Sequence, residues 1–126
     1  MTYKTIWIDH QQAYIYEFSS QHKVFEKYFT KKADTKKIES PRKFTHGKEH
    51  QKMFYHAIAN ELGNPDHVLI LGPGTAKDEF KHHCESHNHE KLAHKIVSTI
   101  PMRSHPRRSE ILKFSKDYFD KYFHLS

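Results

Sequence analysis

The feature that most constrains the fold is the apolar run "HVLIL" at 67–71, which is followed at once by "GPG" at 72–74. A short run of branched aliphatic residues is typical of a strand that is buried on both faces. The glycines and the proline end this strand, and the residues after them favour a helix over about 75–87. A doubly buried strand needs helices on both sides of its sheet, so we predict an α/β protein.

The turn at 72–74 also raises the question of a phosphate site. Thr75 precedes Asp78 at capping-box spacing, which predicts Thr75 as the N-cap of the helix. Free N–H groups at a helix start can receive an anion, which makes Gly72, Gly74 and Thr75 candidate anion-binding residues. However, the turn lacks the sequence of nucleoside-triphosphate loops, and Lys77 replaces the third glycine of the dinucleotide fingerprint. A plain structural turn is therefore the favoured interpretation.

Composition indicates one globular domain over residues 1–126. Hydrophobic residues make up 36% of the chain and aromatic residues 13%, so its core depends on Phe and Tyr. No apolar run approaches the length of a membrane span, and the N-terminus turns polar too early for a signal peptide. The single cysteine, Cys84, excludes an internal disulfide and fits a reducing compartment. These features predict a cytoplasmic protein.

Periodicity along the chain predicts a mixed five-stranded sheet with helices on both faces, in strand order 3-2-1-4-5. This is the three-layer α/β/α arrangement of ribonuclease H-like folds. The first helix is predicted to bury Met53, Phe54, Ala57, Ile58, Glu61 and Leu62. The predicted elements are strands at 4–9, 13–18 and 23–29, a helix at 47–62, a strand at 67–71, a helix at 75–87, a strand at 95–102 and a helix whose first turn holds Pro106.

Asp9 lies where a ribonuclease H-like nuclease places a metal carboxylate, at the end of the first strand. That chemistry needs several carboxylates around two divalent ions. The strand at 67–71 ends without an acid, and the helix at 47–62 supplies one partner at most, Glu49 or Glu61. We therefore predict no nuclease activity, and we expect Asp9 to brace the turn at 10–12.

The net charge of +6 is concentrated in one segment. Residues 30–46 show no usable period and are predicted to form a long basic loop, and a second basic cluster precedes the last helix. Local excess of Lys and Arg indicates a phosphate-rich partner, and a solvated loop that binds nothing is the alternative. The predicted nucleic-acid-binding residues are Lys31, Lys32, Lys36, Lys37, Arg42, Lys43, Lys48, Arg103, Arg107 and Arg108.

Thirteen histidines make the chain histidine-rich. Several are three or four residues apart on predicted helices, a spacing at which two side chains can share a metal. The candidate metal ligands are His46, His50, His83, Cys84 and His87. A structural zinc site needs four ligands in closed geometry, so the pattern predicts no cofactor beyond a weakly bound transition metal. Surface histidines without any ligand are the favoured alternative.

Several local sequences resemble the middle domain of the archaeal and eukaryotic class I peptide-chain release factors and of the related Pelota rescue factors. In that domain a three-stranded meander leads through a basic loop carrying Gly-Gly-Gln into a long helix, and "SPRKFTHGKEHQKMFYHAIANEL" stands in that place here. The resemblance is closer to small stand-alone bacterial proteins called translational machinery proteins. It rests on "WIDH" at 7–10, "FYH" at 54–56, "LGPGTA" at 71–76 and "HP" at 105–106.

The chain departs from the release factors at the catalytic tripeptide. It contains no Gly-Gly-Gln, and Gly47 stands alone between His46 and Lys48. The resemblance therefore implies the fold and a tendency to bind ribosome or RNA, without the hydrolase activity. The predicted function is a non-enzymatic, translation-associated protein that binds through its basic loop. The alternative is a histidine-rich metal-binding or homo-oligomeric protein whose edge strand at 23–29 pairs with a second copy.

Overall fold

A computed structural model describes residues 1–18, 24–30, 48–87 and 89–124, with only the backbone of Lys48. All predicted strands and helices are present in it, with ends shifted by at most two residues, and the short helix α4 is an addition. Among these residues no helix is both long and apolar enough to cross a bilayer. The elements are β1 (Tyr3–Ile8), β2 (Gln12–Phe18), β3 (Val24–Thr30), α2 (Lys48–Leu62), β4 (His67–Gly72), α3 (Ala76–Ser86), α4 (Glu90–Ala93), β5 (Ile96–Pro101) and α5 (Arg108–Phe123).

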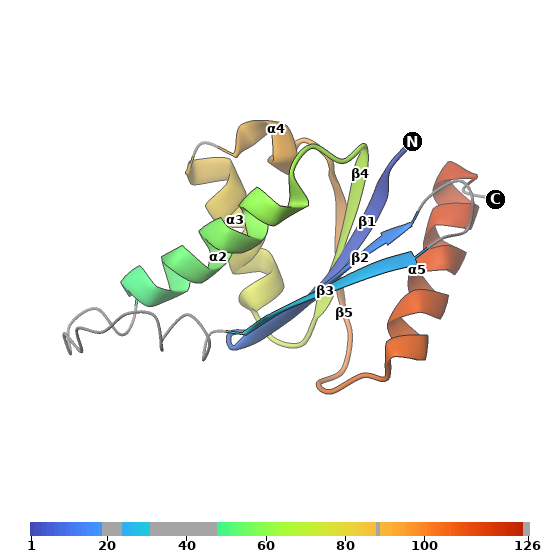
Figure 1. Ribbon diagram of the computed structural model, residues 1–126, viewed down its shortest axis with the longest axis horizontal. Helices are drawn as coiled ribbons and strands as arrows, with labels where there is room; N and C mark the ends of the chain where they lie inside the picture. Colours follow the sequence, from blue (N-terminus) through green and yellow to red (C-terminus); the bar gives the residue numbers. More distant parts are fainter. Residues whose placement is uncertain (19–23, 31–47, 88, 125–126) are drawn as a thin grey trace.

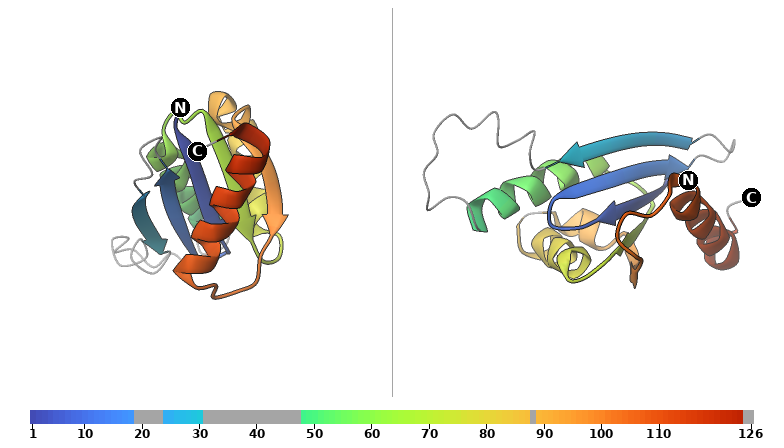
Figure 2. Two further views of the ribbon diagram at one scale, coloured as in Figure 1. Left: turned by 90° about the vertical axis from the view of Figure 1, so that its right-hand side faces the viewer. Right: turned by 90° about the horizontal axis from the view of Figure 1, so that it is seen from below.

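The described strands form one sheet in the order β3-β2-β1-β4-β5, which confirms the predicted order. The β1–β2 and β2–β3 pairs are antiparallel, and the β1–β4 and β4–β5 pairs are parallel. Helices α2, α3 and α4 cover one face of the sheet and α5 covers the other (Figures 1 and 2). The connections from β3 to β4 and from β4 to β5 advance in the same direction across the sheet. Right-handed crossovers therefore place α2 and α3 on the same face.

The two faces of the sheet bury separate hydrophobic cores. Ile6 of β1 and Ile70 of β4 face α2 and α3, where they pack with Phe54, Ile58 and Phe80. Their neighbours along the same strands face α5, where Trp7, Leu69 and Leu71 pack with Ile111 and Phe119. Because β1 and β4 are buried on both faces, their sequences are almost continuously apolar, as the run at 67–71 predicts.

Helix α2 is rotated relative to the predicted buried face. Phe54, Tyr55, Ile58, Ala59 and Leu62 are buried, whereas Met53 is 51% exposed and Glu61 forms a surface ion pair with Lys27 of β3. Hydrophobicity alone ranks Met53 above Tyr55, but Tyr55 can be buried because its hydroxyl donates a hydrogen bond to Glu79. The prediction for Met53 and Glu61 was wrong.

The start of α5 also differs from the prediction. The helix begins at Arg108 with Arg107 as its N-cap, so Pro106 precedes the cap and does not belong to the first turn. The backbone N–H of Arg107 donates to Glu110 Oε1, 3.2 Å away, which satisfies one of the groups left free at a helix start.

Candidate functional site

The turns that carry most of the predicted site residues leave the sheet at one edge, where the parallel strands end (Figure 1). β1 ends at Ile8, β4 at Gly72 and β5 at Pro101. Thr30, the last residue of β3, pairs with Gln12, so the predicted basic loop starts beside the turn between β1 and β2. Ligands of open α/β sheets commonly bind at this carboxyl-terminal edge.

The basic loop itself lies outside the described residues, apart from Thr30 at its start. The two ends of the connection are described, namely β3 up to Thr30 and the backbone of α2 from Lys48. The nucleic-acid-binding role of the loop therefore stays a prediction. The predicted contacts outside the described residues are Lys31, Lys32, Lys36, Lys37, Arg42 and Lys43, together with the side chain of Lys48.

The arginine cluster at the start of α5 is described, and two of its members pair with acids. The Arg103 guanidinium donates two hydrogen bonds to the Glu110 carboxylate, one from Nε to Oε2 at 3.0 Å and one from Nη2 to Oε1. Arg108 Nε lies 3.5 Å from Glu26 Oε2 on β3. Hydrogen bonds from Arg103 and then from the Arg107 backbone lower the pKa of Glu110 to about 2. These exposed pairs are weak, so the arginines can still meet a phosphate, but part of their charge is neutralised.

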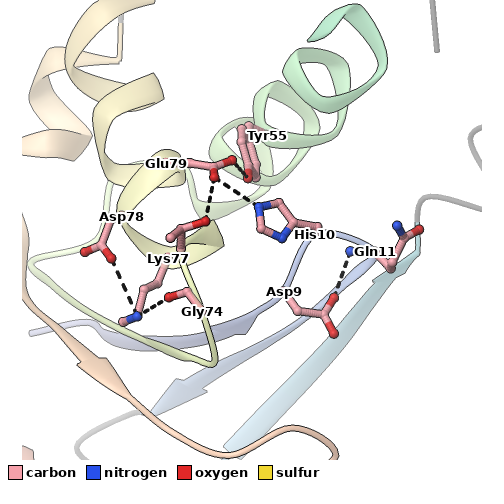
Figure 3. Close-up of polar contacts among 9 residues, drawn as sticks. Asp9, His10, Gln11, Tyr55, Gly74, Lys77, Asp78 and Glu79 are labelled. Carbon is pink, nitrogen blue, oxygen red and sulfur yellow. Dashed lines mark hydrogen bonds and ion pairs between the residues drawn. The ribbon is translucent and has the colours of Figure 1, made fainter. Parts of the chain in front are cut away.

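The turn between β1 and β2 is braced by Asp9, as predicted. Asp9 Oδ1 accepts hydrogen bonds from the backbone N–H groups of Gln11 and Gln12, each at 2.8 Å, and the first of these is drawn in Figure 3. The Asp9 N–H in turn donates to the Gln12 carbonyl at 3.0 Å. Among the described residues, no group of three closely spaced metal ligands includes Asp9. The Asp9 carboxylate therefore holds its own turn.

Next to this turn, the Glu79 carboxylate of α3 joins three segments of the chain (Figure 3). Its Oε2 accepts a hydrogen bond from the Thr75 hydroxyl at 2.7 Å and lies 3.1 Å from His10 Nε2, while its Oε1 accepts from the Tyr55 hydroxyl at 3.1 Å. Partial burial raises the pKa of Glu79, but these three contacts outweigh it and leave the pKa below its usual value. Burial, followed by the charge of Glu79, raises the pKa of Tyr55.

The Glu79→Gln variant is expected to lose a small, pH-dependent part of the free energy of unfolding. A carboxyl whose pKa is lowered by folding stabilises the protein above its unfolded-state pKa of about 4.3, and this contribution is lost as the pH falls through the folded-state pKa. Because the Glu79 side chain is 45% exposed, the effect at neutral pH is expected to be about half a kcal/mol. Denaturant unfolding of both proteins between about pH 3 and pH 7 measures it.

The exposed Glu85→Gln change on the same helix is the matched control, and it is expected to leave the pH profile unaltered. A constant difference between Glu79→Gln and the unaltered protein down to the acid end would contradict a pH-dependent role for Glu79.

The glycines of the turn between β4 and α3 serve close packing. A Cβ on Gly72 would lie 2.1 Å from the carbonyl oxygen of Ile8, so β1 occupies the space that any side chain would need. Gly74 has a φ of +58°, which favours glycine, and open space around its Cα. Glycine is therefore required at position 72 because β1 packs against it. Glycine is favoured at position 74 because the turn needs a positive φ there.

The turn that carries the predicted anion site is held by contacts between the chain's own side chains and backbone. Lys77 Nζ donates to the Gly74 carbonyl and lies 3.5 Å from Asp78 Oδ2 (Figure 3). Thr75 is the N-cap residue, as predicted, but its hydroxyl donates to Glu79 and does not cap the helix. Two carboxylates in the first turn of α3 oppose a bound anion. Anion binding by Gly72, Gly74 and Thr75 stays a prediction, and the plain structural turn is the better supported interpretation.

Histidines from α2 and from the end of α3 converge on the outer side of these two helices. One ring nitrogen from each of His56, His83 and His89 lies within 4.8 Å of the other two, and His56 Nδ1 is 3.1 Å from His89 Nε2. His83 is only 5% exposed. Burial, followed by the neighbouring histidines, lowers the pKa of His83 to about 4, and burial lowers the pKa of His89. Their imidazoles are therefore neutral at physiological pH.

This group shares only His83 with the metal ligands predicted from spacing. Cys84 is fully buried in the core between the helices and the sheet, and burial raises the pKa of its thiol to about 12. His87 stacks on His83 with ring centroids 4.4 Å apart. His50 is not in the group, and His46 lies outside the described residues. Sequence reasoning missed His56 because only the packing of α2 against α3 brings it to His83.

Solved structures with this fold include translation factors. The chain is similar to Pelota from Thermoplasma acidophilum, with a TM-score of 0.62, to Pelota from Archaeoglobus fulgidus, with 0.63, and to the archaeal translation termination factor aRF1, with 0.66, each at 16% sequence identity. The matches cover 98%, 92% and 98% of this chain but only 33%, 31% and 36% of those proteins.

The chain therefore spans about a third of the length of these proteins. No protein-family model and no curated protein sequence matches it. The resemblance to bacterial translational machinery proteins stays a prediction. The resemblance to the release factors and Pelota is confirmed for the fold, which this chain shares with part of Pelota and aRF1.

Proposed function

We propose that this chain is a non-enzymatic, translation-associated protein that binds the ribosome or RNA through its basic loop. The observation that carries the proposal is that the most basic segment of the sequence directly follows β3. The chain shares its fold with part of two kinds of translation factor, and its most basic segment leaves the sheet beside Gln12, at the edge where open α/β sheets bind ligands.

The excess of basic residues in the loop favours a partner that is rich in phosphates. Residues 30–48 hold seven basic and two acidic residues, whereas Arg103 and Arg108 are each paired with a glutamate. Contacts to phosphates need only clustered Lys and Arg, without a defined pocket. Among the described residues the aromatic side chains lie mostly in the two cores, so few of these remain as stacking platforms for bases. Binding is therefore proposed to depend on the phosphate backbone and little on base sequence.

The proposal that the chain is not an enzyme rests on a missing tripeptide and on the contacts of two carboxylates. The chain has no Gly-Gly-Gln, and the Asp9 carboxylate is engaged by the backbone of its own turn. The Glu79 carboxylate is likewise engaged, by His10, Thr75 and Tyr55. Release of peptide from peptidyl-tRNA by the purified chain would contradict this part of the proposal.

Pairing of β3 with a second copy is the less favoured alternative. β3 does lie at the edge of the sheet, and Phe25 and Tyr28 on it are 57% and 49% exposed. However, Glu26 and Lys27 are also exposed on this strand, and charged side chains on an edge strand oppose pairing between sheets.

Replacing Lys36, Lys37, Arg42 and Lys43 together by Ser is expected to weaken RNA binding for all base sequences. If each removed cation neutralises one phosphate, the slope of log K against log[salt] on single-stranded RNA should flatten by about 0.7 per contact, or about 3 in total. Fluorescence anisotropy of labelled RNA across a salt series measures the slope. Co-sedimentation with ribosomes from the native host tests the same variant on its proposed partner.

The double variant Lys116→Ser/Lys121→Ser is the control, because both residues are exposed on α5. It is expected to change binding only slightly. Equal loss per removed charge in both variants would mean that diffuse positive charge accounts for binding, and the loop would lose its special role.

A further inference from the structure

We propose that His56, His83 and His89 form a binding site for one Zn²⁺ ion. The three side chains come from α2, from α3 and from the link between α3 and α4, which places the site on the face of the sheet that these helices cover. None of the three belongs to the proposed nucleic-acid-binding residues, so the zinc site would be a second site.

The arrangement already brings three imidazole nitrogens almost to coordination distance. Tetrahedral Zn²⁺ holds its histidine nitrogens at about 2.0–2.1 Å, which places them about 3.3 Å from one another. His56 Nδ1 and His89 Nε2 are 3.1 Å apart, and all three ligand nitrogens lie within 4.8 Å. A small movement of the His83 ring or of the link that carries His89 would close the site.

The buried His83 ring supplies the second observation. Its Nε2 is shielded from solvent and has no hydrogen-bond partner among the described residues. A buried nitrogen without a partner is costly, so it indicates a ligand that completes the site. In addition, His56 Nδ1 and His89 Nε2 are only 3.1 Å apart, and two imidazole nitrogens at this distance repel one another unless a proton or a metal ion lies between them.

The ligand set favours a transition metal such as Zn²⁺ over Mg²⁺ and Ca²⁺. Imidazole suits Zn²⁺, Cu²⁺ and Ni²⁺, whereas Mg²⁺ and Ca²⁺ prefer oxygen ligands, and no carboxylate belongs to this group. Three protein ligands leave a fourth position for water. His56 and His83 line a cavity of about 620 Å³, which gives that water access from solvent.

Isothermal titration calorimetry with Zn²⁺ alone, in a non-chelating buffer, tests the site. The unaltered protein is expected to bind one ion per chain in a saturable step. His56→Gln and His89→Gln are each expected to weaken that step at least about tenfold, since loss of even an outer-shell group costs about 10–100-fold in affinity. Both side chains are at least partly exposed, so neither change should unfold the chain, and circular dichroism checks this.

Two controls separate the site from general binding by histidines. His94→Gln removes an exposed histidine outside the group and is expected to bind Zn²⁺ as the unaltered protein does. His46→Gln/His50→Gln removes the pair whose spacing alone suggests a metal site, and it should also retain the step. Loss of affinity in either control equal to that in His56→Gln, or binding of several ions without a one-to-one step, would overturn the proposal.

Discussion

Replacing Gly72 by alanine is expected to cost a large part of the stability of the domain. The new Cβ would meet the Ile8 carbonyl oxygen at 2.1 Å, and both atoms are fixed to the backbones of adjacent central strands, which cannot move apart without breaking the β1–β4 pairing. Overpacking and backbone strain each cost about 1–3 kcal/mol, so the sum is about 2–6 kcal/mol. Denaturant unfolding measures the loss, and poor soluble expression would be its first sign.

Gly74→Ala, two residues further on, is the matched control. Its φ of +58° disfavours alanine, but no heavy atom lies within 4 Å of the new Cβ. The expected loss is about 1–2 kcal/mol, from the left-handed conformation alone. If the two variants lost equal stability, the close approach of β1 to Gly72 would not be what excludes a side chain there.

Trp7→Ala is expected to have an effect of similar size for a different reason. Trp7 is fully buried in the core under α5, and removal of a large buried aromatic ring costs about 3–5 kcal/mol. Its indole Nε1 also donates a hydrogen bond to the Arg103 carbonyl at 3.2 Å, so the ring fixes the backbone that leads into the arginine cluster. Thermal and denaturant unfolding should agree on the loss, and RNA affinity is expected to fall with the folded fraction.

Two further variants separate the contribution of the Trp7 hydrogen bond from that of its packing, and compare a buried ring with an exposed one. Trp7→Phe keeps most of the packing but leaves the Arg103 carbonyl without the indole donor, so a smaller loss of about 1–3 kcal/mol is expected. Tyr122→Ala removes an aromatic ring that is 56% exposed on α5 and is expected to cost less than about 1 kcal/mol. A Trp7→Ala loss no larger than that of Tyr122→Ala would show that the core relaxes around the missing indole.

The strand order was predictable because each step depends on local sequence. Alternation at 23–29 marks a half-buried strand, the run at 67–71 marks a doubly buried one, and Gly63 and Pro65 end the helix between them. Gly63 does adopt a φ of +65° after α2. Once the elements are known, the rule of right-handed crossovers leaves few arrangements.

The histidine group was not predictable in the same way. Spacing within one helix links His83 to His87, but the structure joins His83 to His56 of α2 and to His89 beyond the end of α3. That grouping depends on how far α2 is rotated about its axis. The rotation in turn buries Tyr55, whose hydroxyl donates a part-buried hydrogen bond to Glu79, 24 residues away in sequence. Periodicity in hydrophobicity carries no signal for such a long-range polar contact.

The central position of β1 has a consequence for the chain as it leaves the ribosome. β1 pairs on one side with β2, which is made directly after it, and on the other side with β4. β4 follows roughly fifty residues after β2, which takes about 3–10 s at ordinary elongation rates. During that interval the apolar β1 strand has one unpaired edge, the state in which nascent sheets are most prone to aggregate. The domain is therefore expected to depend on shielding during synthesis more than its small size suggests.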